Sequence, residues 1–138
     1  MREILFRGKR IDNGEWIEGY YVKAVHHWHK HGIHEDWLIT GAAANGGWFA
    51  IHNRHAVDPA TVGQYTGLTD KNGKKIFEGD IVRYEIQAGA CVVFRSDLMH
   101  VEWSEQTAQF IVTGDCSYIM DSANKYEIIG NIHDNPEL

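Results

Sequence analysis

Apolar and polar residues alternate in short runs along this chain, and turn residues separate the runs. Residues 62–68 alternate loosely, with Val62, Gln64, Thr66 and Leu68 on one face. Asn72-Gly73 follows, and this pair favours a hairpin because both residues tolerate a positive φ. The β-branched and aromatic residues of 81–86 then predict another strand. The stretch Thr61–Tyr84 is therefore predicted to be a β-meander.

A second tight turn is predicted at Glu78-Gly79-Asp80, between Ile76-Phe77 and the strand at 81–86. Gly79 is expected to take the positive φ, and Asp80 to accept backbone N–H bonds that settle the turn. Asn13-Gly14 predicts a similar turn near the start of the chain. A helix is a poor alternative for the meander, because its four glycines would each cost about 1 kcal/mol.

Similar short runs predict the other strands, at 3–7, 16–22, 37–40, 48–51, 91–94, 99–103, 110–112 and 126–132. The segment 115–125 has weak strand character, and Asp115 or Ser117 could cap a single helical turn there. We expect an all-β, mainly antiparallel fold: a barrel-like or sandwich-like meander with possible SH3-like elements and at most one or two short helical turns. The length of 138 residues predicts one domain, 1–138.

A set of short pieces lies at both termini and in the meander: Met1–Ile4, Phe6-Arg7, Val57–Pro59, Thr61–Leu68, Asp70–Lys74, Ile76–Val82, Ile128–Ile132 and Asn135–Leu138. Together these pieces resemble the YopX family of phage and prophage proteins. Segments 61–84 and 126–138 are family-typical, and 23–55 is a variable middle. The resemblance implies a mostly-β fold, a phage context and the cytoplasm of a bacterial host; it implies no particular chemistry.

The net charge of −6 is uneven, which bears on possible partners. Residues 95–138 carry two basic and eight acidic residues, and this part would repel a phosphate backbone. No apolar run approaches the roughly 18 residues that cross a bilayer, and no signal peptide is recognised. We expect a cytoplasmic protein without a membrane partner. Cys91 and Cys116 have no CxxC spacing, so buried free thiols are expected rather than a disulfide.

The run His26–His34 is the most unusual local composition in the chain. In a strand, His27, His29 and His31 would point to one face and could ligate a transition metal. No established ligand spacing is present, so a solvated histidine-rich loop is the favoured interpretation, and no cofactor is predicted. A metal-dependent enzyme built on this run is the third hypothesis.

Lys71, Lys74 and Lys75 form a basic tip at the predicted hairpin. With Tyr65 and Phe77 as stacking platforms, the tip could bind single-stranded nucleic acid. The competing interpretation is a lysine-protected hairpin that resists aggregation. A nucleic-acid-binding SH3-like barrel in phage replication or transcription is the second hypothesis, which the net charge disfavours.

Aromatic residues are more numerous than a core of this size readily holds, namely Trp16, Tyr20, Trp28, Trp37, Trp48 and Trp103. Some are expected on a surface for self-association or a partner; an aromatic-rich core is the alternative. The sequence has no GxSxG, cysteine-centred or GxxxxGK[ST] motif, and no catalytic residue is predicted. The favoured hypothesis is a non-enzymatic phage accessory protein that acts through contacts with a host or phage protein or, as a homo-oligomer, with itself.

Overall fold

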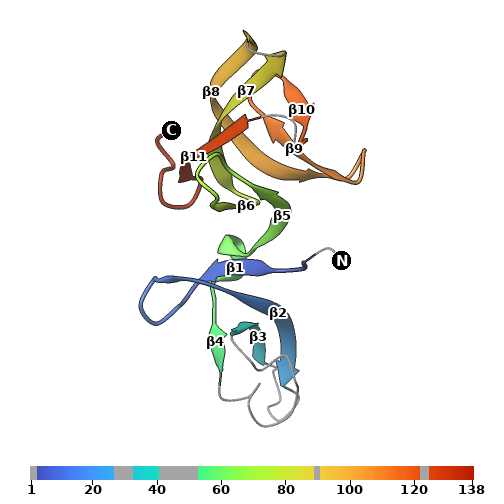
Figure 1. Ribbon diagram of the computed structural model, residues 1–138. Helices are drawn as coiled ribbons and strands as arrows, with labels where there is room; N and C mark the ends of the chain where they lie inside the picture. Colours follow the sequence, from blue (N-terminus) through green and yellow to red (C-terminus); the bar gives the residue numbers. More distant parts are fainter. Residues whose placement is uncertain (1–2, 27–32, 41–52, 89–90, 122–124) are drawn as a thin grey trace. The chain divides into compact units, whose positions relative to one another are not determined.

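The computed structural model describes residues 3–26, 33–40, 53–88, 91–121 and 125–138, and it is built from antiparallel strands (Figure 1). The strands are β1 (Phe6–Lys9), β2 (Trp16–His26), β3 (Ile33–Ile39), β4 (Arg54–Ala56), β5 (Gly63–Thr69), β6 (Lys75–Phe77), β7 (Asp80–Ala88), β8 (Cys91–Ser104), β9 (Gln109–Thr113), β10 (Ser117–Ile119) and β11 (Lys125–Asn131). A 3₁₀ turn, η2 (Pro59–Thr61), is the one helical element in these ranges. The all-β, antiparallel prediction is confirmed.

Two sheets form, with strand orders β4-β3-β2-β1-β5-β6 and β10-β9-β8-β7-β11. Within the described ranges neither sheet closes on itself, so the barrel form of the prediction is wrong and the sheets are open. The contacts of the chain define two compact units, residues 3–64 and 65–138, which are described separately. The single domain expected from the sequence stays a prediction.

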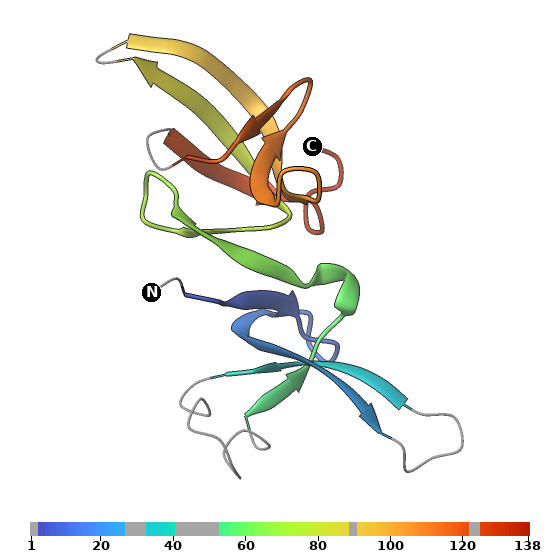
Figure 2. The same cartoon turned by 90° about the vertical axis from the view of Figure 1, so that its right-hand side faces the viewer.

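The first unit has its core on one face of its sheet. Leu38 and Val57 are fully buried there. β1 comes close to them because Gly8 has no side chain: a Cβ at Gly8 would lie 3.3 Å from Val57 Cβ. On the same face, the rings of Phe6 and Tyr21 lie 5.7 Å apart. Figure 2 shows β2 and β3 running side by side in opposite directions.

The second unit packs β6 against its five-stranded sheet. The buried cluster consists of Ile76, Val82, Tyr84, Met99, Val101, Val112 and Tyr126. The rings of Tyr84 and Tyr126 stack with centroids 5.3 Å apart, and such a pair adds about 0.5–1.5 kcal/mol beyond its buried area. Burial, the largest cause, raises the pKa of Tyr84 to about 12, and Tyr126 adds to the effect.

Three local predictions need correction or lie outside the described residues. The helical turn considered near Ser117 is wrong: Ser117–Ile119 is strand β10, which pairs with β9. Cys116 is exposed, not buried as expected. The strand predicted at 48–51 lies outside the described residues.

Candidate binding surfaces

One face of the first sheet, opposite to its core, gathers aromatic and basic side chains. Register places them together: Lys9 pairs with Trp16, Val22 with Trp37, and Ile39 with both Tyr20 and Arg54. Because side chains alternate along a strand, residues of one pair share a face. We call this surface the tryptophan face; it consists of Arg7, Lys9, Trp16, Glu18, Tyr20, Val22, Trp37, Ile39 and Arg54, so three cations share it with one carboxylate.

Three cations of the tryptophan face lie over indole rings. The guanidinium carbon of Arg7 is 4.8 Å, and Lys9 Nζ 5.5 Å, from the centre of the Trp16 ring. The guanidinium carbon of Arg54 is 4.6 Å from that of Trp37. Each contact attracts the cation to the ring's negative face and contributes about 0.5–1 kcal/mol at an exposed site. The stacks therefore hold positive charge against an apolar surface.

The centre of the tryptophan face is open to solvent. Tyr20 is 48% and Val22 39% exposed. The Nε1 atom of Trp37 is buried and has no hydrogen-bond partner. A strand with one buried face normally turns polar residues to the other. The exposed Tyr20 and Val22 depart from that pattern.

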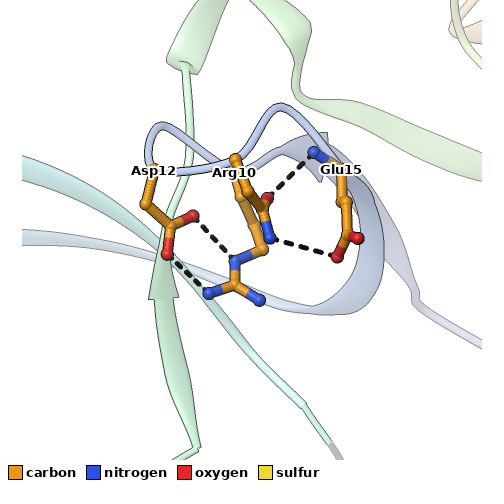
Figure 3. A network of polar contacts seen from close by, with 4 residues as sticks. Arg10, Asp12 and Glu15 are labelled. Atoms are coloured by element: carbon orange, nitrogen blue, oxygen red, sulfur yellow. Dashed lines mark hydrogen bonds and ion pairs between the residues drawn. The ribbon is translucent and has the colours of Figure 1, made fainter.

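A hollow next to Trp37 borders the tryptophan face at β4. The described residues that line it are Arg10, Ile11, Asp12, Trp37, Arg54, His55 and Ala56. Arg10 binds Asp12 through two bonds, Nε–Oδ1 at 2.9 Å and Nη2–Oδ2 at 2.6 Å (Figure 3). The hydrogen bond from Arg10 lowers the pKa of the Asp12 carboxyl, and the same bond raises the pKa of Arg10. Asp12 thus balances the charge of Arg10.

The Asn13-Gly14 turn positions this ion pair. Gly14 has a φ of 71°, and Asn13 Oδ1 accepts a 3.0 Å hydrogen bond from the Glu15 N–H. The Arg10 N–H donates to the Glu15 carbonyl at 2.9 Å (Figure 3). The turn therefore fixes the loop between β1 and β2.

The three lysines predicted as a basic tip have separate environments. Lys71 Nζ lies 3.0 Å from Glu127 Oε2, and Lys75 Nζ lies 5.6 Å from the centre of the Tyr65 ring. Lys74 is exposed. Tyr65 is only 7% and Phe77 only 2% exposed, and their ring centres lie 5.6 Å apart. Neither ring has a free face on which a base could stack, so the predicted platforms do not fit the structure.

Both turns of the meander are held by buried carboxylates. Gly73 and Gly79 have φ values of 80° and 86°. Asp80, 1% exposed, accepts a 2.8 Å hydrogen bond from the Phe77 N–H. The turn that contains Asn72 and Gly73 is closed by Asp70, whose Oδ1 accepts the N–H groups of Asn72 (2.8 Å) and Lys74 (2.9 Å).

The sequence did not single out Asp70, although it connects two elements. Its Oδ2 accepts a 3.2 Å bond from the Ile128 N–H on β11. Burial acts to raise the pKa of Asp70, but the three N–H donors and the charge of Lys74 outweigh it, so the pKa lies below its ordinary value. An aspartate at the first position of a turn is a recognisable signal. The bond to Ile128 is not, since it joins residues 58 positions apart.

Two observations on the described residues bear on metal binding and on membrane insertion. The described residues contain no group of three or more His, Cys, Asp or Glu side chains that could hold a metal ion. The predicted ligands His27, His29 and His31 lie outside the described residues, as do Trp28 and Trp48. No helix in the described part of the chain is long and apolar enough to span a bilayer.

Fold and surfaces together define an all-β protein with a broad aromatic and cationic sheet face. The chain belongs to the YopX family: the family model described as YopX protein matches residues 5–138. A similar solved structure is the crystal structure of protein EF1440 from Enterococcus faecalis. It has 23% sequence identity and a TM-score of 0.51, and the alignment covers 99% of this chain and 98% of that chain. This likeness shows the fold alone. A comparison with curated proteins finds no match.

Proposed function

We propose that this chain is a non-enzymatic accessory protein of a phage or prophage that acts in the cytoplasm of a bacterial host through protein–protein contacts. Its working surface is the tryptophan face. The observation that supports this proposal is the gathering of Trp16, Trp37, Tyr20, Arg7 and Arg54 on one sheet face. Trp, Tyr and Arg are the residues enriched at binding hot spots.

The charge of the tryptophan face specifies the chemistry of the partner. Arg7, Lys9 and Arg54 lie over apolar rings, where a partner would displace water from both the ring and the cation. A carboxylate that approaches a partly desolvated guanidinium makes a stronger, charge-assisted bond than it would in water. The complementary surface is therefore acidic at its rim and apolar at its centre, opposite Tyr20 and Val22.

Site-specific photo-crosslinking in bacterial cells tests this proposal. A benzophenone side chain replaces Val22 on the face or, as a control, Ala60, which is exposed on η2. Light should produce a discrete protein adduct from position 22, and the changes Lys9→Glu and Arg54→Glu should remove it. Position 60 should give no such band. Equal adducts from both positions, or none from position 22, would refute the tryptophan face as the contact surface.

Single-stranded nucleic acid is a second candidate ligand, and one observation favours it. Arginine and lysine beside exposed aromatic rings can bind phosphates while bases stack. Against it, residues 65–138 carry six basic and twelve acidic residues. Titration with an oligothymidylate distinguishes the candidates. Quenching of tryptophan fluorescence that weakens steeply with salt would support nucleic acid, and no change at low salt would exclude it.

A further inference from the structure

A second apolar surface lies on the outer face of the second unit, across β8, β9 and β10. Register places Glu102, Ile111 and Ile119 in one row: Glu102 pairs with Ile111, and Ile111 with Ile119. This row lies on the side of the sheet opposite to Val101 and Val112, which belong to the core. Ile119 is 52% exposed although it is a large apolar residue. The outer face thus offers hydrophobic area to another molecule.

This outer face is hollowed next to the β8–β9 hairpin. The lining includes Glu102, Trp103, Glu105, Ile111, Tyr118 and Ile119, and we call it the acidic hollow. Trp103 is 38% exposed, and its ring meets that of Phe110 edge to face, with centroids 5.0 Å apart. Trp103 pairs with Phe110 and so shares the face of Val101, whereas the outer-face part of the hollow is formed by Glu102, Ile111 and Ile119.

The charges around the acidic hollow are of one sign. Glu102 and Glu105 line it, and the described residues of its lining include no lysine or arginine. His100 Nε2 lies 3.5 Å from Glu102 Oε2. The second unit as a whole is also acidic: residues 65–138 carry six basic and twelve acidic residues, a net charge of −6. Residues 1–64 carry seven of each, a net charge of zero. The hollow therefore favours a partner that presents cations around an apolar centre.

The tryptophan face has that chemistry. We propose that the acidic hollow of one molecule binds the tryptophan face of a second copy of this chain. Glu102 and Glu105 meet the cations stacked on Trp16 and Trp37, while Ile111 and Ile119 meet Tyr20 and Val22. This inference rests on the proposed function, because it names the partner of the same face.

The geometry of such a contact has a consequence for assembly. The two surfaces are different, so the contact is heterologous and leaves each molecule with one unused surface of each kind. Copies therefore add head to tail, and the assembly grows with concentration unless the rotation between neighbours closes a ring. Because the contact joins opposite charges at a solvent-exposed rim, added salt weakens it.

Sedimentation velocity over a concentration series with charge-reversed variants tests the pairing. One variant carries Lys9→Glu and Arg54→Glu; the other carries Glu102→Lys and Glu105→Lys. The unchanged chain should exceed its 15.7 kDa monomer mass as concentration rises, and each variant alone should associate at least tenfold more weakly. An equimolar mixture of the two variants should associate again, because each then meets a surface of opposite charge. A variant that had simply unfolded could not be rescued in this way.

Each possible result decides between the inference and its rivals. A chain that stays monomeric at all concentrations, or association that neither variant changes, would overturn the inference. Failure of the mixture to associate would do the same. If the benzophenone at position 22 links to a different protein while the chain remains monomeric, the proposed function stands and the second copy is not the partner.

Discussion

Asp70 is the clearest case of one side chain that determines local structure in this protein. Its two oxygens accept three backbone N–H groups, two in its own turn and one on β11. The side chain is 6% exposed, so water offers no replacement for these bonds. Because the bonds favour the charged form, the pKa of Asp70 lies below its unfolded value of about 3.9.

Replacing Asp70 by asparagine should lower the free energy of unfolding by about 1–3 kcal/mol at pH 7, because the amide NH₂ would face the N–H of Ile128. A group with a depressed folded pKa stabilises the fold above its unfolded pKa, and this contribution is lost as pH falls through the folded pKa. The difference between the two proteins should therefore narrow below about pH 3.9. Urea unfolding of both proteins at several pH values measures this difference in the free energy of unfolding.

Asp58→Asn is the matched control for this change. The Asp58 side chain is exposed and accepts one hydrogen bond, from the Ala60 N–H at 3.0 Å. We expect a smaller effect, within about 1 kcal/mol. An equal loss of stability in both variants would show that the link between Asp70 and β11 contributes little.

At the scale of elements, the close approach of β2 and β3 depends on Gly19. A Cβ at this position would lie 2.3 Å from the Ile39 carbonyl oxygen, which is too short for any real contact. Gly19→Ala should therefore force the strands apart and lower the free energy of unfolding by about 1–3 kcal/mol. Lys23→Ala, at an exposed position on the same strand, should change it by less than about 0.5 kcal/mol. Thermal unfolding compares the two, and equal midpoints would contradict the role of Gly19.

Strands with a strong local sequence signal could be predicted from the sequence. Strands that form only because a neighbouring strand pairs with them could not. The hairpin around Asn72-Gly73 and the β-branched strand β7 are examples of the first kind. β4 is short and polar, and β10 follows a residue that suits a helix cap; both are strands because β3 and β9 offer them hydrogen-bonding partners. Register likewise brings Lys9 beside Trp16 and Arg54 beside Trp37. The sequence predicts a surplus of aromatic residues. It does not predict that Arg7, Lys9 and Arg54 lie over indole rings.

At the scale of the whole molecule, strand β5 takes part in the pairing of both units. Gly63 and Gln64 pair with β1, and Tyr65 and Thr69 pair with β6. Loss of this strand would remove hydrogen bonds from both units at once. We therefore expect one cooperative unfolding transition, with tryptophan fluorescence and far-ultraviolet circular dichroism giving the same midpoint. Gly19→Ala and Asp70→Asn should each move that single midpoint, and a two-step curve in either variant would show independent units.

The hairpin tip between β5 and β6 also makes hydrogen bonds to the main chain of β11, the last strand of the second sheet. The Lys71 N–H donates to the Tyr126 carbonyl at 2.9 Å, and Asp70 accepts the N–H of Ile128. These main-chain groups would otherwise be a template onto which a foreign strand could be added. With these two groups occupied, β11 offers less free main chain to a strand from another copy, so this edge of the sheet is a poorer starting point for fibre growth.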